Sequence, residues 1–160
     1  MIQAITETDL TAFVQTEDNR INTSVSSDKI RYLVKFTNDL SGNVKYAYGQ
    51  SQTIRERYTD FTLTHNTTEN VFTGAINLKP FGYHKYELYE VSFNGTVPTL
   101  DANTAPISET DVANDTGSVH GTVKGLVEQG KLLVSETVGS EQVKYTQYTE
   151  TTSTNYIHIN

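Results

Sequence analysis

The sequence predicts an all-β protein, an immunoglobulin-like or jelly-roll-like antiparallel β-sandwich with an extended N-terminal arm. Threonine and tyrosine, which favour strands, are abundant, with 25 Thr and 10 Tyr in 160 residues. Apolar and polar residues alternate with a period of two in several segments, as they do in half-buried strands. Clusters of turn-forming residues separate many of these segments at intervals of roughly 8–12 residues, which is typical of a β-sandwich.

The first half of the chain contains the clearest strands. Residues 30–37 carry a large apolar side chain at every second position, which predicts a strand. A run of turn formers precedes a second alternating segment, residues 44–48, so the two segments predict a β-hairpin. Residues 57–64 alternate again, with Phe61 and Leu63 on one face.

The second half continues the pattern with weaker signals. Residues 71–78 predict a short strand or a lead-in, and residues 83–92 predict a long strand rich in tyrosine. Residues 119–124 and 130–136 predict two further strands on either side of a turn. The last expected strands lie at residues 142–149 and 155–160.

The predicted organisation is one domain with two additions. Residues 1–27 contain only scattered large apolar residues, so we expect an extended N-terminal arm that pairs with a neighbouring sheet. Residues 28–160 form the single sandwich domain. Residues 93–118 hold four acidic residues and no Lys or Arg, which predicts an acidic loop insertion that is mobile or lies along a partner. A calcium site among these acids stays open, although the regular order of a calcium-binding loop is absent.

Composition excludes several kinds of chemistry. The chain has no Cys, so it has no disulfide framework, thiolate nucleophile or Cys-ligated metal. The formal net charge of −7 argues against nucleic acid as a partner, because affinity for phosphate depends on clustered Lys and Arg. Residues 1–20 lack the pattern of a signal peptide, and no window approaches the roughly 20 apolar residues of a membrane-spanning helix. We therefore expect synthesis in the cytoplasm and no membrane partner.

No catalytic or cofactor-binding motif is present in the sequence. The four His match no metal-binding spacing, and the glycine-rich motifs of nucleotide-binding enzymes are absent. The sequence thus predicts a protein that is not an enzyme and binds no cofactor or metal. Aromatic residues with a polar tip suit subunit interfaces, although the same residues also suit core packing or sugar binding. The candidate interface residues are Tyr83, Tyr86, Tyr89, Phe13 and Ile5.

A family resemblance rests on the order of the predicted strands and on three short motifs. The motifs are Arg57-Tyr58, Tyr86-x-x-Tyr89-Glu90 and Val127-Glu128-x-Gly130-Lys131. In these features the chain resembles small β-sandwich virion structural proteins of tailed bacteriophages, of the head-decoration, head-fibre or tail-associated type found in crAss-like phages. The resemblance covers roughly residues 28–92 and 125–160.

This resemblance implies a non-enzymatic structural subunit of the virion, assembled in the host cytoplasm. The expected role is that of an auxiliary or decoration protein on the capsid, which binds and stabilises neighbouring capsid subunits. The implied partners are the major capsid protein or other virion subunits, together with further copies of the chain in a homo-oligomer. A tail- or baseplate-associated protein and a carbohydrate- or receptor-binding sandwich stay open as alternatives.

Overall fold

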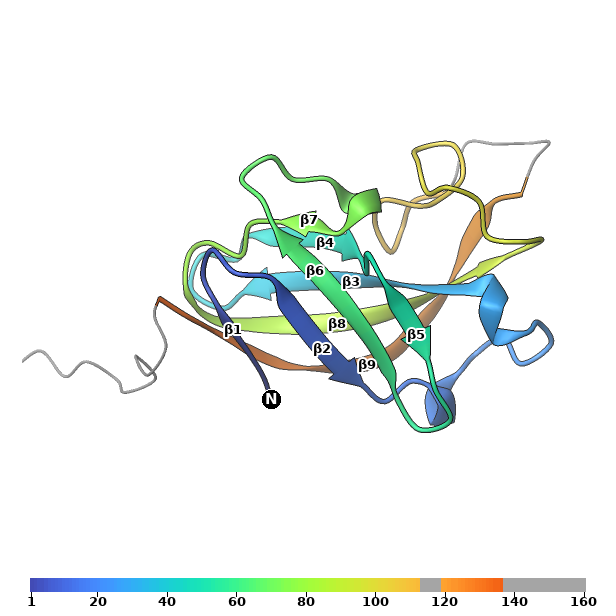
Figure 1. The fold of residues 1–160 in the computed structure, drawn as a ribbon, viewed down its shortest axis with the longest axis horizontal. Coiled ribbons are helices and arrows are strands. Elements are labelled where there is room, and N and C mark those ends of the chain that lie inside the picture. The colour runs from blue at the N-terminus through green and yellow to red at the C-terminus, as the bar shows by residue number, and fades with distance from the viewer. Residues whose placement is uncertain (113–118, 137–160) are drawn as a thin grey trace, which may run out of the picture.

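The computed structural model describes residues 1–112 and 119–136, which fold into two β-sheets packed against each other (Figure 1). The predicted all-β sandwich is confirmed. Its strands are β1 (Ile2–Ile5), β2 (Leu10–Val14), β3 (Ile30–Asn38), β4 (Val44–Tyr48), β5 (Gln52–Ile54), β6 (Thr59–His65), β7 (Ala75–Ile76), β8 (Gly82–Phe93) and β9 (Gly121–Ser135). Short 3₁₀ helices are η1 (Glu17–Asn19), η2 (Ser27–Lys29) and η3 (Val71–Thr73).

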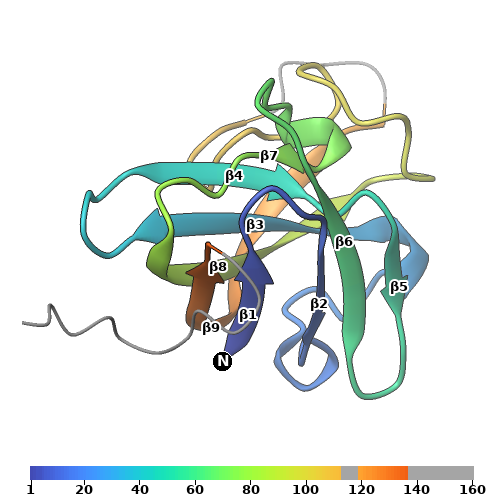
Figure 2. The same cartoon turned by 60° about the vertical axis from the view of Figure 1, so that its left-hand side comes forward.

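The two sheets differ in size. The large sheet has five strands in the order β1-β9-β8-β3-β4, and the small sheet has the order β2-β6-β5, with β7 paired to β6. Neighbouring strands are antiparallel, except that β1 is parallel to β9 and β7 is parallel to β6. Figure 2 shows β4, β3, β8 and β9 in one layer and β2, β6 and β5 in the other. Each sheet therefore has an inner face, turned towards the other sheet, and an outer face.

Alternating apolar residues of the two inner faces form the main core. In β3, Tyr32, Val34 and Phe36 are each exposed by no more than 2%. In β6, Phe61 and Leu63 belong to the same buried cluster. Fully burying one such side chain contributes roughly 1.5–3 kcal/mol, so this cluster is the main source of stability. The period of two that predicted these strands reflects this burial on one face.

Residues 1–27 belong to the sandwich, so the predicted extended arm is wrong. β1 pairs with β9 in the large sheet, and β2 pairs with β6 in the small sheet. In β2, Leu10 and Val14 point into the core, whereas Phe13 points outwards. These strands have only four and five residues and place small Ala4 and Ala12 at inward positions. The apolar signal is therefore weak in the sequence.

A buried carboxylate fixes the chain between β2 and β3. Glu90 of β8 has 0% exposure, and its two carboxylate oxygens accept hydrogen bonds from the backbone N–H groups of Ile21 (2.7 Å) and Asn22 (2.8 Å). The side-chain amide of Asn22 also donates to Ser92 Oγ at 2.8 Å. Because a buried charge is costly without such partners, these bonds tie the segment firmly to the large sheet.

β9 is one continuous strand, whereas the sequence predicts two strands around a turn. Val127 and Lys124 are extra residues at two shifts in its register with β8, which are β-bulges. At the second bulge Gly125 adopts a φ of 148°, which favours glycine. A Cβ on Gly130 would come within 2.7 Å of the hydroxyl oxygen of Tyr86. The glycines that resemble turn residues thus allow a bulge and a close packing contact inside a strand.

The other predicted strands agree with the structure to different degrees. The hairpin of β3 and β4 is confirmed, as are the strands now named β6 and β8. The segment 71–78 contains η3 and only the two residues of β7. The strands predicted at 142–149 and 155–160 lie outside the described residues.

Replacing Glu90 with Ala is expected to lower the free energy of unfolding by about 3 kcal/mol, because it removes a fully buried side chain and leaves two partly buried backbone N–H groups without acceptors. Chemical denaturation followed by circular dichroism measures this change. Glu56→Ala, at an exposed position before β6, is the control and should change the free energy by less than about 0.5 kcal/mol. A loss below about 1 kcal/mol in Glu90→Ala would contradict the anchoring role of Glu90.

Candidate functional site

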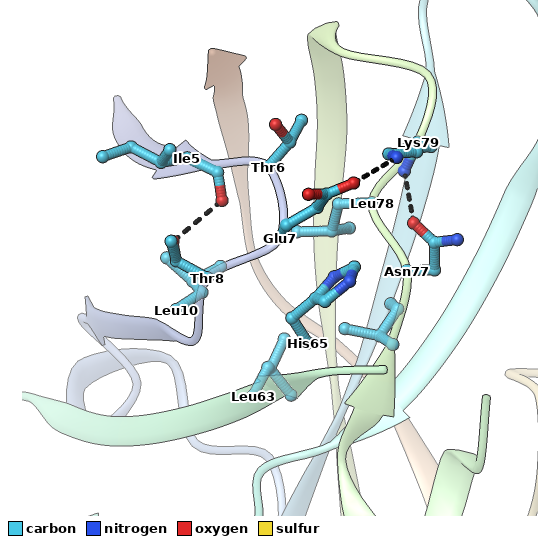
Figure 3. A pocket seen from close by; sticks show the side chains of 11 residues that line it. Ile5, Thr6, Glu7, Thr8, Leu10, Leu63, His65, Asn77, Leu78 and Lys79 are labelled. Atoms are coloured by element: carbon cyan, nitrogen blue, oxygen red, sulfur yellow. Dashed lines mark hydrogen bonds and ion pairs between the residues drawn. The ribbon is translucent and has the colours of Figure 1, made fainter. Parts of the chain in front are cut away.

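A narrow pocket lies between the sheets beside the turn that joins β1 to β2 (Figure 3). Its volume is about 10 Å³, which is about the space that one water molecule needs. Leu63 and Leu78 contribute apolar lining. The side chains of Glu7 and Lys79 point towards each other in Figure 3, with 2.5 Å between carboxylate oxygen and Nζ. The pocket is therefore too small for a substrate or an organic cofactor.

A wider hollow of about 640 Å³ opens to solvent next to this pocket and shares Glu7 and Lys79 with it. Phe81, which is 58% exposed, is part of its lining. Glu136 adds one further carboxylate to the lining. Glu7 and Lys79 in its lining form an ion pair with each other. The hollow is thus an open surface depression that contains one ion pair and one exposed aromatic ring.

Across residues 1–112 and 119–136, His, Asp and Glu side chains do not gather in a group of three or more that could hold a metal ion. In the same part of the chain, we find no helix with the length and apolar character that crossing a membrane requires.

The acidic insertion packs on the outer face of the large sheet as far as it is described, at the upper right of Figure 1. Val97, Leu100 and the fully buried Ala105 lie against a second apolar cluster that includes Leu33 and Phe93. Residues 94–112 therefore pack on the chain's own large sheet, a contact that the sequence does not predict. The cause is a second layer of apolar contacts, which the acidic composition conceals.

One acid of the insertion is bound directly by the large sheet. Glu109 Oε1 lies 2.5 Å from Lys35 Nζ, and Glu109 Oε2 accepts a hydrogen bond of 2.5 Å from the hydroxyl of Tyr46. Asp111 accepts from the backbone N–H of Ile107 at 2.9 Å, and Asp101 accepts from backbone N–H groups in its own turn. The described acids therefore act as internal acceptors, and the suggested calcium site finds no support among them.

The pKa values around Glu109 follow from these contacts. Burial opposes ionisation of Glu109, but the hydrogen bonds from Lys35 and Tyr46 outweigh it, so its pKa lies below the ordinary value. The hydrogen bond to Glu109 raises the pKa of Lys35. Burial and the bond to Glu109 raise the pKa of Tyr46 to about 12. All three groups therefore keep one protonation state near neutral pH, which suits a structural contact.

The other half of the large sheet's outer face is exposed, towards the left of Figure 1. Tyr83 of β8 lies opposite Leu133 of β9, and Lys85 lies opposite Lys131 in the next row of the same face. Val44, on β4, continues that row. Tyr83 is 53% exposed and Val44 45%. We call these five residues the bare face.

The candidate interface residues lie in different places. Tyr83 is on the bare face. Tyr86 is in the core at 6% exposure, where its hydroxyl donates to Glu128 Oε1 at 2.9 Å, and Tyr89 is half-buried beside the second apolar cluster. Ile5 is half-buried and lines the narrow pocket. Phe13 is 64% exposed on the outer face of the small sheet. The structure therefore leaves Tyr83 and Phe13 exposed, on opposite sides of the sandwich.

Around Phe13 lies a cluster that the sequence did not predict. The rings of Phe13 and Tyr58 meet edge to face with 5.8 Å between their centres. The guanidinium carbon of Arg55 lies 5.7 Å from the centre of the Tyr58 ring, and Arg55 Nε donates to Asp60 Oδ1 at 2.9 Å. We call these four residues the aromatic cluster. The Arg55–Arg57 segment resembles a solvated strand edge in sequence, and only the turn that returns Tyr58 towards β2 brings the cluster together.

No family model, curated protein or solved structure matches this chain. The structural evidence for a function therefore comes from the chain's own surfaces. Of these, the bare face and the aromatic cluster combine exposed apolar side chains with oriented charged groups. Such combinations are typical of binding surfaces.

Replacing Glu109 with Gln is expected to lower the free energy of unfolding at pH 7 by about 1 kcal/mol, because it removes the charge that Lys35 and Tyr46 contact. The folded-state pKa of Glu109 is lowered, so its stabilisation is present above the ordinary value of 4.5 and is lost as the pH falls below it. Stability should therefore depend less on pH in the variant below about pH 5, as measured by denaturation across a pH series.

Glu7→Gln is the control for that experiment. Glu7 also pairs with a lysine, but its side chain is 63% exposed and solvent screens the pair, so Glu7→Gln should lower the free energy of unfolding much less than Glu109→Gln. Equal losses in the two variants would contradict a special role for Glu109.

Proposed function

We propose that this chain is a non-enzymatic structural subunit of a bacteriophage particle, an auxiliary protein that binds neighbouring subunits on the capsid. The resemblance to small virion proteins supports the kind of particle. The bare face carries the structural part of the argument, since it is an exposed sheet surface with a tyrosine beside two lysines and two aliphatic residues. Tyrosine is enriched at the core of protein interfaces and is a frequent hot spot there.

The chain's own insertion shows how a segment binds this outer face. Residues 94–112 cover the other half with apolar contacts and one carboxylate that meets both a lysine and a tyrosine hydroxyl. The bare face offers the same residue types, with Lys85 and Lys131 next to Tyr83. Leu40, which is 93% exposed, and Phe81, at 58%, lie in the loops where β3 ends and β8 begins. Lys85 already pairs with Glu87 and Lys131 with Asp39, so a capsid subunit that presents an apolar segment is the partner that fits.

Mass spectrometry and cryo-electron microscopy of purified particles test the proposal. We expect the chain in the particle in many copies, with its bare face against neighbouring subunits. If the chain is found on the tail, the capsid role is wrong and the tail- or baseplate-associated role is supported. Absence of the chain from the particle would refute a virion function.

Tyr83→Asp should reduce attachment to particles about tenfold or more, because a carboxylate that must lose its water would replace the aromatic ring at the contact. Phe13→Asp is the matched control, since it adds the same charge at an exposed aromatic position on the opposite side, and it should attach normally. Co-sedimentation of each purified variant with particles that lack the protein measures the effect. Normal attachment of Tyr83→Asp would exclude the bare face as the contact.

A further inference from the structure

We infer that the aromatic cluster on the outer face of the small sheet is a binding site for a neutral glycan. It comprises Phe13 on β2, Arg55 and Tyr58 in the turn between β5 and β6, and Asp60 on β6. This site is separate from the bare face, so it neither requires the proposed function nor follows from it.

The strand register places a ring and a carboxylate side by side. Phe13 and Asp60 are direct partners in the pairing of β2 with β6, so their side chains leave the same face, with Cβ atoms about 5 Å apart. Phe13 is 64% exposed, which leaves much of its ring open to solvent. The face of an aromatic ring carries partial negative charge and attracts weakly positive C–H groups. A pyranose ring presents a row of such C–H groups on one of its faces.

The polar half of the site is held in place before any ligand arrives. Arg55 uses Nε–H to bind Asp60 Oδ1 at 2.9 Å, and its guanidinium lies over the Tyr58 ring. The backbone N–H of Arg55 donates to the carbonyl of Tyr58 at 2.9 Å, which closes the turn. The backbone of Arg55 and the Nε side of its guanidinium are thereby held, so less side-chain entropy is lost on binding.

Donors and acceptors remain available at this position. Within the described part of the chain, the structure records no hydrogen-bond partner for the terminal amino groups of Arg55 or for Asp60 Oδ2. These atoms offer N–H donors next to a carboxylate acceptor. Of two neighbouring hydroxyls on a sugar, one can accept a hydrogen bond from an Arg55 amino group and the other can donate one to Asp60 Oδ2. The hydroxyls of Thr11 and Thr62, 3.4 Å apart in the adjacent row of the same face, extend the polar surface.

The charge of the aromatic cluster and the angle between its two rings indicate which class of ligand it can bind. Arg55 and Asp60 cancel each other's charge, so the site favours an uncharged ligand over an acidic peptide, whose carboxylate would meet Asp60. The planes of Phe13 and Tyr58 are inclined at 66°, so they do not form one flat platform for several stacked sugars. A single neutral sugar unit, at an end or branch of a glycan, fits this arrangement best.

Titration of the ¹⁵N-labelled full chain with neutral oligosaccharides tests the inference by NMR. The probes are maltotriose, cellotriose, xylotriose, chitotriose and lactose. We expect saturable shifts of backbone amides in residues 11–13 and 55–62 with one of them. Absence of shifts with all five probes at about 10 mM would overturn the inference.

Variants identify the site independently of the ligand panel. Phe13→Ala should weaken binding about tenfold or more, and Asp60→Asn should do the same, because one removes the stacking ring and the other the charged acceptor. Phe13→Tyr keeps the ring and should bind within about threefold of the natural chain. Tyr83→Ala, an exposed aromatic on the opposite side, should leave binding unchanged. Undiminished binding in Phe13→Ala, or attachment of a protein partner at this cluster without any sugar binding, would overturn the inference.

The virion role and the glycan site can be refuted independently of each other. If the chain is absent from particles but the oligosaccharide shifts map to residues 11–13 and 55–62, the virion role is wrong and the glycan site stands. If the chain occupies the capsid but Phe13→Ala binds sugar as well as the natural chain, the glycan site is wrong and the virion role stands.

Discussion

The buried carboxylate of Glu90 is the constraint on which one end of the sandwich depends. A charge with no solvent exposure is tolerated only because two backbone N–H groups point at it. Those groups belong to Ile21 and Asn22, so the path of the chain between the two sheets is set by a side chain in β8. The connection that enters β3 therefore starts from a fixed position. The N-terminal strands themselves belong to the domain because β1 pairs with β9 and β2 pairs with β6.

Burial on both faces of the large sheet is the second organising feature. Its inner face packs on the small sheet, and half of its outer face packs on residues 94–112. Glu109 binds that segment to Lys35 and Tyr46, so the acidity of the insertion serves an internal contact. The rest of the outer face keeps the same residue types without a cover from the described part of the chain. This asymmetry distinguishes surface needed for folding from surface available for binding.

Strands with large side chains at every second position were predictable, because burial on one face imposes a period of two on the sequence, as in β3 and β6. Three features could not be predicted from the sequence, each for its own physical reason. β2 places Ala12 between its inward residues, which weakens the pattern. β9 contains bulges at Lys124 and Val127, which shift the alternation, and its glycines resemble a turn. The aromatic cluster depends on a turn that brings Arg55 and Tyr58 to Phe13, over forty positions away, and no local pattern encodes that proximity.

The opposite outer faces of the sandwich give this small domain two independent sides. Tyr83 and Phe13 leave different sheets in opposite directions, separated by the core and a sheet spacing of about 10 Å. An occupant of one side does not obstruct the other. A subunit of this shape can lie flat on a large assembly while turning its second surface to the surroundings. Attachment and display would then be separable properties that can change independently in evolution.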